Sequence, residues 1–274
     1  MWASTGYEPV VQMPTPPTMT PGVDRVGIVL PARDEAERVA DAIVAIGEAA
    51  RVVRAHVAVV VTVVDHGSTD RTGAIARSAL ADLSELGITT RLMFATRGGV
   101  GTARHVGITG MTGHWRRPDR AWVLSTDADS RVRPDWIVRY IRHAEAGALA
   151  VAGVVDLFDD GESSDFRSRW RTDYGSSLFA DGTHPHAHAA NLGVRLDAYR
   201  GSGGFRDVGP ADDRDLWRRL RAGGVEPVAD SSIVVDTSGR RTGRVPAGFA
   251  TALSTLYPLE RDPVDLGFAA GAAG

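Results

Sequence analysis

The sequence of 274 residues contains no cysteine and no lysine, and it has one asparagine, Asn191, and one glutamine, Gln12. The absence of cysteine excludes disulfide bonds and thiolate metal sites. The 31 residues counted as lysine or arginine are therefore all arginine. We interpret this replacement of lysine along the whole chain as a compositional bias, so the abundance of arginine is not a functional signal. The single asparagine has survived the same bias, which hints at a side-chain amide that no other residue replaces.

The sequence also lacks long apolar stretches and a large excess of charges of one sign. No run of about 18 apolar residues is present, so the sequence predicts no membrane-spanning helix. The N-terminus lacks the basic and apolar segments of a secretory signal. We therefore expect a cytoplasmic protein, with peripheral association with a membrane surface left open. The net charge of −3 with mixed signs argues against a nucleic-acid-binding protein.

The length allows one large domain or two small ones. Residues 1–23 contain several prolines among small and polar residues, which predicts a disordered arm. Residues 24–245 form the expected folded domain. Residues 246–274 are expected to form a C-terminal helix and a tail of small residues.

Apolar runs alternate with segments of helical periodicity through the first half of the chain. The run at 56–65 is too continuously apolar for a half-exposed strand and is typical of a central parallel strand. The alternation predicts an α/β protein with a mostly parallel central sheet flanked by helices. The second half is less regular. Expected strands are residues 25–30, 56–65, 88–95, 121–124, 148–155, 191–195 and 228–235.

Caps mark the starts of two expected helices. Asp34 and Glu37 match a capping box for a helix that runs to about residue 51. Ser68 or Thr69 is the expected cap of the next helix.

Two carboxylates, Asp127 and Asp129, directly follow the expected strand at 121–124. In an open α/β sheet, ligands bind at the carboxyl ends of the strands. An Asp-x-Asp pair in such a place can hold a divalent cation and, through it, a diphosphate. Taken alone, the pair also fits an ordinary turn.

Several further short motifs occur in a defined order. They are Leu30-Pro31-Ala32-Arg33-Asp34-Glu35, Val63-Val64-Asp65-His66-Gly67-Ser68-Thr69-Asp70, residues 99–107 with Arg104, the Asp127/Asp129 pair, Gly203-Gly204-Phe205 and Ala211-Asp212-Asp213-Arg214-Asp215-Leu216. Their order and spacing over about residues 25–245 resemble the family 2 inverting glycosyltransferases of the GT-A fold. The resemblance implies a Rossmann-like, mostly parallel sheet with a mixed second half. It divides the domain into a nucleotide-binding half, 24–130, and an acceptor half, 131–245.

The resemblance assigns roles in donor binding to residues of the first half. Asp65 matches the carboxylate that accepts hydrogen bonds from the nucleotide base. Pro31, Arg33 and Glu35 match the loop that borders the nucleotide, with a surface ion pair as the alternative for the two charged residues. Arg104 matches a position facing the diphosphate, against the alternative of an ordinary solvated arginine.

The resemblance also implies the chemistry of the carboxylates. Asp129, together with Asp127, would bind Mg²⁺ or Mn²⁺, and Asp127 would also contact the ribose or the donor sugar. Asp213 matches the general base that takes the proton of the acceptor hydroxyl, with Asp212 or Asp215 as alternatives. Asp213 lies at the start of a helix, whose positive end is expected to keep it ionised.

Other candidate residues lie in the second half. Asn191, Arg240 and Arg241 are expected to contact the donor, the two arginines by clamping phosphate oxygens. Asp236 stands where many GT-A enzymes place another metal ligand. The alternating His184, His186 and His188 would share one face of an extended segment. Contact with acceptor or donor, a zinc site and a polar loop are all open for them.

The leading functional hypothesis is a metal-dependent, inverting transfer of a sugar from a nucleoside-diphosphate sugar to a hydroxyl acceptor. A sugar-phosphate nucleotidyltransferase is the first alternative, although residues 31–35 lack the glycine-rich phosphate loop typical of that class. A non-catalytic nucleotide- or carbohydrate-binding relative is the second. The sequence does not identify the sugar, the nucleotide, the acceptor or the oligomeric state.

Overall fold

The structure is a computed structural model, which describes residues 22–158, 163–209, 211–243 and 248–257. Most of the predicted disordered arm and the tail after residue 257 lie outside the described residues. Within this part of the chain, no helix is long and apolar enough to cross a membrane.

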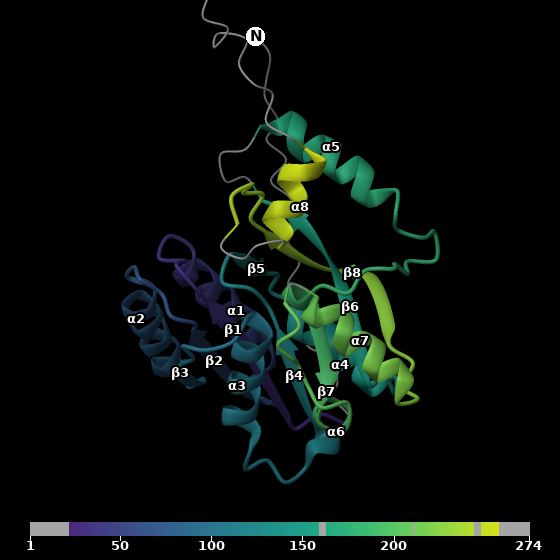
Figure 1. Ribbon diagram of the computed structural model, residues 1–274. Coiled ribbons are helices and arrows are strands. Elements are labelled where there is room, and N and C mark those ends of the chain that lie inside the picture. Colours follow the sequence, from purple (N-terminus) through teal and green to yellow (C-terminus); the bar gives the residue numbers. More distant parts are fainter. Residues whose placement is uncertain (1–21, 159–162, 210, 244–247, 258–274) are drawn as a thin grey trace, which may run out of the picture.

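Eight helices flank one eight-stranded sheet in the described part of the chain (Figure 1). The strands are β1 Arg25–Ala32, β2 Ala58–Asp65, β3 Thr89–Phe94, β4 Ala121–Ser125, β5 Ser130–Val132, β6 Ala150–Leu157, β7 Leu192–Arg195 and β8 Val228–Thr237. The α-helices are α1 Val39–Val53, α2 Thr72–Glu85, α3 Val100–Thr112, α4 Trp136–Glu145, α5 Ser164–Gly175, α6 Leu196–Gly201, α7 Asp212–Ala222 and α8 Phe249–Leu256.

The strand order is β3-β2-β1-β4-β7-β6-β8-β5. The first four of these neighbours pair in parallel, as do β6 and β8. Strand β7 runs antiparallel to both β4 and β6, and β5 runs antiparallel to β8. The expected α/β fold, mostly parallel with a mixed second half, is therefore confirmed.

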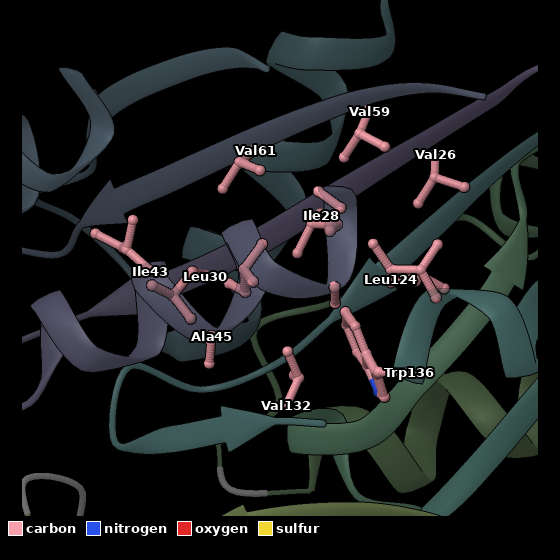
Figure 2. Packing of buried hydrophobic residues seen from close by; sticks show 14 of the residues in the cluster. Val26, Ile28, Leu30, Ile43, Ala45, Val59, Val61, Leu124, Val132 and Trp136 are labelled. Atoms are coloured by element: carbon pink, nitrogen blue, oxygen red, sulfur yellow. The ribbon is translucent and has the colours of Figure 1, made fainter. Parts of the chain in front are cut away.

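Alternating side chains of the central strands fill two cores on opposite faces of the sheet. On one face, Ile28 of β1 and Leu124 of β4 belong to a cluster with Ile43 of α1 and Trp136 of α4 (Figure 2). On the other face, Val29 joins residues of α3, α6 and α7. A third cluster packs α5 and α8 against the end of β6. Helices thus cover both faces and leave the carboxyl edge of the parallel strands open for a site.

The order of the strands places a topological switch point between β1 and β4. The chain proceeds outward from β1 to β2 and β3, and then returns to pair β4 with the other side of β1. Crevices form at such points because the connections after the two strands leave in opposite directions. The Asp127/Asp129 pair follows β4 at this crevice.

The predicted helix caps are wrong, because the two loops that carry them bind each other. Helix α1 begins only at Val39, and neither it nor α2 has a side-chain cap on its N-cap residue. Asp34 has φ of 53°, and its Oδ1 accepts hydrogen bonds from N and Oγ1 of Thr69 at 2.7 and 3.0 Å. Ser68 Oγ in turn accepts from the N–H of Asp34 at 3.1 Å. The loops meet because β1 and β2 are parallel neighbours.

Other boundaries differ from the predictions. Strand β1 continues through Pro31 to Ala32, because Pro31 stays in register with Val64 of β2. The short elements β5 and α6 were not predicted, because three and six residues are too few for a periodic pattern.

Candidate functional site

A pocket of about 400 Å³ lies at the carboxyl ends of β1, β4, β6 and β8. The first residues of α3, α7 and α8 complete its wall. Eight of the predicted site residues line this pocket, namely Pro31, Arg33, Glu35, Arg104, Asp127, Asp129, Asp213 and Arg240. Folding therefore brings together side chains that are up to about 200 positions apart in the chain.

Arg240 joins two of the carboxylates in the pocket. Its guanidinium contacts Asp129 Oδ2 at 2.8 Å and bonds both carboxylate oxygens of Glu35, one of them at 2.7 Å. Glu35 is buried and pairs with Arg240, so the alternative of a surface ion pair does not hold for it. Burial, with the neighbouring Asp127 and Glu35, raises the pKa of Asp129 to about 7 although Arg240 opposes the shift. Burial thus outweighs the contact with Arg240 at Asp129.

Arg104 is buried, which excludes the alternative of an ordinary solvated arginine. It is 4% exposed, and its two terminal nitrogens donate to Asp212 Oδ2 at 2.6 Å and to Asp127 Oδ1 at 2.5 Å. The two carboxylates raise the pKa of Arg104 despite its burial. Arg104 thus links α3, α7 and the loop after β4, and its contact with a diphosphate stays a prediction.

The structure distinguishes the three aspartates of the 212–215 run. Asp212 is buried and paired with Arg104. Asp215 bonds Arg218 and Arg219 and does not line the pocket. Asp213 lines the pocket, and its side chain accepts hydrogen bonds from backbone N–H groups, that of Ala189 at 3.1 Å and that of Arg214 at 2.6 Å. Among the residues that the structure describes, Asp213 alone offers a carboxylate to the pocket without an arginine partner.

The environment of Asp213 shifts its pKa in the direction opposite to that expected from the helix end. Burial raises the pKa, and the neighbouring Asp212 adds to the effect. The two backbone N–H bonds and Arg104 oppose the shift without cancelling it. A raised pKa makes Asp213 a stronger base than an ordinary aspartate.

Asp65 lies at the end of β2, next to the pocket residue His66. It is 7% exposed, and its Oδ1 accepts a hydrogen bond from the N–H of Ser68 at 2.9 Å. Its Oδ2 faces Gly73 at the start of α2, where a Cβ atom would lie 2.6 Å away. Its side chain is thus turned from the pocket toward α2, and its contact with a base stays a prediction.

Asn191 does not bind a ligand in this structure, which corrects its expected role. Its side chain is fully buried, and Oδ1 accepts from Trp136 Nε1 at 2.9 Å and from the Tyr140 hydroxyl at 2.8 Å. Its Nδ2 donates to the carbonyls of Val154 and Ile233 at 2.7 and 2.9 Å. All four hydrogen-bonding positions of the amide are used. The survival of the single asparagine thus has a structural explanation.

Two further candidates face away from the pocket. Arg241 donates to the carbonyl of Tyr257 at 3.1 Å and lies over the ring of Phe166, which corrects its expected contact with the donor. Asp236 bonds Arg133 at 3.0 Å, while the next residue of β8, Thr237, lines the pocket. The alternation of side chains along β8 explains why Asp236 points elsewhere.

The three alternating histidines form a stack, as their spacing predicts. Ring centroids are 5.8 Å apart between His184 and His186 and 5.3 Å apart between His186 and His188. Tyr174 stacks on His186 at 4.5 Å, and of the three histidines only His188 lines the pocket. Burial lowers the pKa of all three, that of His188 to about 3.

The carboxylates of Asp127 and Asp129 fit a divalent cation. Within the described residues, no group of three or more His, Asp or Glu side chains is arranged to hold a metal ion. Mg²⁺ and Mn²⁺ are hard cations, and Mg²⁺ in particular is commonly bound by one or two carboxylates together with phosphates of the substrate. The raised pKa of Asp129 also favours a positive charge at this place.

Sequence reasoning missed the contribution of α8 to the pocket. Gly248, Phe249 and Ala250, at the start of this helix, line the wall near His188 and Val155. The helix was predicted, but its docking depends on the aromatic contacts of the third core cluster. No local signal in the sequence shows those contacts.

Comparisons with known proteins agree with this architecture. Residues 27–202 match the family described as Glycosyl transferase family 2. No curated protein matches the chain at a significant level.

Among solved structures, the mannosyltransferase PcManGT from Pyrobaculum calidifontis, in complex with GDP-Man and Mn²⁺, is similar with a TM-score of 0.58 and 19% identity. The match covers 85% of this chain and 69% of that chain. TarS from S. aureus in complex with UDP-GlcNAc has a TM-score of 0.56 and 11% identity, with 81% of this chain and 60% of that chain covered.

This chain thus spans about 60% of the length of that chain, TarS 1–349, and 36% of the longer TarS chain in another structure. At these identities the likeness shows the fold alone. The family match covers more than half of the sequence and includes the strand ends after β1, β2 and β4. The chain belongs to glycosyl transferase family 2 and has the GT-A fold.

Proposed function

We propose that the protein transfers a sugar, with inversion, from a nucleoside-diphosphate sugar to a hydroxyl acceptor in a metal-dependent reaction. One observation carries this proposal. A single pocket presents the Asp127/Asp129 pair together with Asp213, a carboxylate that pairs with no arginine of the described ranges. The relatives in complex with GDP-Man and Mn²⁺ and with UDP-GlcNAc support the class of donor.

Asp127 and Asp129 would hold the cation, as the fit of their carboxylates suggests. When bound, a divalent cation acts as a Lewis acid and stabilises the charge of the departing nucleoside diphosphate. Arg240, which already neutralises Asp129 and Glu35, stands where it can also contact phosphate oxygens.

Asp213 would act as the general base. The N–H of Ala189 holds its Oδ2, so the carboxylate is oriented before the acceptor binds. The carboxylate takes the proton of the acceptor hydroxyl while that oxygen attacks the anomeric carbon on the face opposite the diphosphate. Its raised pKa strengthens it for this step, although proton transfer should still follow the onset of bond making.

The first test is incubation with a panel of UDP-, GDP- and dTDP-sugars and Mn²⁺, measuring released nucleoside diphosphate. Release by transfer or slow donor hydrolysis is expected. Pyrophosphate release from a nucleoside triphosphate and a sugar phosphate would overturn the proposal in favour of a nucleotidyltransferase. Tight nucleotide binding without turnover would indicate a non-catalytic relative.

The assignment of the base is tested by Asp213→Asn. General-base catalysis contributes about 10²- to 10⁴-fold, and we expect a loss of kcat of this order. Asp215→Asn is the matched control, because Asp215 lies on the same helix but bonds only arginines. Equal activity of the two variants would contradict the assignment.

The metal assignment is tested by Asp129→Asn with Asp236→Asn as its control. Asp236 lies on a neighbouring strand and bonds Arg133 instead of facing the pocket. Calorimetry should show that Mn²⁺ no longer strengthens binding of UDP or GDP to the Asp129 variant, while the control behaves as the wild type. Retention of the Mn²⁺ effect in Asp129→Asn would contradict this assignment.

A further inference from the structure

The histidine stack ends at the pocket, and its hydrogen bonds determine which nitrogen of each ring carries the proton. His184 Nδ1 accepts from the N–H of His186 at 3.2 Å, so its Nε2 carries the proton and donates to the carbonyl of Ala152 at 3.0 Å. Ser177 Oγ donates its only proton to the carbonyl of Tyr174 at 2.5 Å. His186 Nε2 must therefore donate to Ser177 Oγ, which lies 2.6 Å away.

His188 has the opposite tautomer. The Tyr174 hydroxyl lies 3.0 Å from His188 Nε2 and also accepts from the N–H of Val155 at 3.5 Å. A backbone N–H cannot accept, so within the described chain His188 Nε2 is the only acceptor for the hydroxyl proton of Tyr174. This pairing assigns the proton of the neutral His188 ring to Nδ1, because the Tyr174 hydroxyl then has an acceptor.

His188 lines the pocket, and its Nδ1 is left without a hydrogen bond among the described residues. This nitrogen is also not among the side-chain nitrogen and oxygen atoms that are buried without a hydrogen-bond partner, so its surface is accessible. His188 lines the pocket beside Ala189, whose N–H holds the carboxylate of Asp213. The hydrogen-bond donor His188 and the proposed general base Asp213 therefore lie close together, because Ala189, the residue after His188, bonds Asp213.

The walls around this donor are apolar. Val155, Ala189, Ala190 and Phe249 line the pocket near His188, and the Phe249 and His188 rings are 6.4 Å apart in an edge arrangement. A sugar or polyol presents oxygen atoms at its edge and C–H groups on its faces. A neutral N–H donor between apolar walls is complementary to such a molecule.

We propose that His188 binds the acceptor, with Nδ1–H donating a hydrogen bond to an oxygen of a neutral sugar or polyol, and that Tyr174 is the positioning residue that holds the ring in this tautomer. The proposal rests on the proposed function, because it assigns the acceptor side of the same pocket. Of the three stacked histidines, His184 has both ring nitrogens bonded within the protein, and neither His184 nor His186 lines the pocket.

The tautomer is tested first, without any turnover. Long-range ¹H–¹⁵N spectra of the histidine side chains, assigned with His188→Asn, should show a protonated Nδ1 and an unprotonated Nε2 for His188 at neutral pH. Glycerol, used as a simple polyol, should shift the His188 Nδ1 signal and leave those of His184 and His186 unchanged. An Nε2-protonated ring, or no effect of glycerol on His188, would overturn the proposal.

Activity provides the second test, with glycerol as the acceptor and released nucleoside diphosphate as the readout. Asparagine places its amide N–H near the position of Nδ1, whereas glutamine places it near Nε2. His188→Asn should therefore raise KM for glycerol less than His188→Gln does. His188→Gln should raise it on the order of tenfold, the effect of one lost hydrogen bond, with KM for the donor unchanged. The reverse ranking would overturn the assignment.

Variants of the stack separate positioning from folding. Tyr174→Phe should raise KM for glycerol, because His188 loses the partner that fixes its tautomer. Ser177→Ala is the matched control, since it removes the partner of His186 only, and KM should not change. Equal effects of the two would indicate a merely structural stack and overturn the role of Tyr174. If no donor is turned over, the proposed function fails, and the spectra still decide the tautomer and polyol contact of His188.

Discussion

At the scale of single residues, the hydrogen bonds that a side chain makes within the protein distinguish the residues that support this site from those that can contact a ligand. Asn191 and Arg104 were both expected to contact the donor, and both are committed to protein partners. Asp213 and His188 each keep a polar group open to the pocket. A polar residue whose bonds are all made inside the protein supports the site, and one with a bond left over is available to a ligand.

Asn191→Asp tests the structural role of the buried amide. The substitution removes both N–H donors, leaves the carbonyls of Val154 and Ile233 without their partner and buries a carboxylate. Leaving a buried group unsatisfied costs about 1–3 kcal/mol. We expect the free energy of unfolding in urea to fall by about 3 kcal/mol. An unchanged midpoint would contradict the role of the amide.

At the scale of elements, the segment from His184 to Asn191 joins core and pocket. Its histidines stack on α5, and its end is held by Asn191 between β6 and β8. Strand alternation predicted the common face of the histidines. Which of them reaches the pocket depends on how α5 packs, which the local pattern does not show.

The burial of His188 predicts a pH dependence of stability. Its pKa is lowered to about 3 by burial and by the neighbouring His186, His184 and Arg214, whereas an unfolded histidine titrates near 6.5. Between these values the unfolded state binds the extra proton, so stability is complete above pH 6.5 and falls as the pH approaches 3. The slope approaches about 1.4 kcal/mol per pH unit.

Urea denaturation at a series of pH values measures this dependence. His188→Phe should show a shallower loss of stability between pH 6.5 and 4.5 than the wild type, because the titrating group is gone. His114→Gln, a change at an exposed histidine, serves as the control and should keep the wild-type slope. Identical slopes for all three proteins would refute the prediction.

At the scale of the whole molecule, Arg104 connects the two halves of the domain. It extends from α3 to Asp127 after β4 and to Asp212 at the start of α7. The bridge fixes the helix of the proposed base relative to the proposed metal site. Asp127 therefore belongs both to this bridge and to the proposed metal site.

Removing one partner of the Arg104–Asp212 ion pair should lower the free energy of unfolding more than removing both. Arg104→Met leaves the buried Asp212 without its cation, and breaking a buried pair in this way costs about 3–5 kcal/mol. The double variant Arg104→Met/Asp212→Leu leaves no buried charge at this point and should be more stable than Arg104→Met alone. If the double variant lost as much free energy of unfolding in urea as the two single variants together, the coupling between Arg104 and Asp212 would be contradicted.

The sequence by itself determined the fold class, the sites of most strands and the place of the Asp127/Asp129 pair at a strand end, because burial on both faces demands continuous apolar runs and strand ends carry the polar groups. The place of Asp213 in the pocket was expected only from the family resemblance of the 211–216 motif. Only the tertiary structure decided that Arg240 pairs with Glu35, that Arg241 and Asn191 face away, and that one histidine of three reaches the pocket. Those outcomes depend on contacts between residues distant in the chain, and no local period or motif encodes which partner a side chain meets.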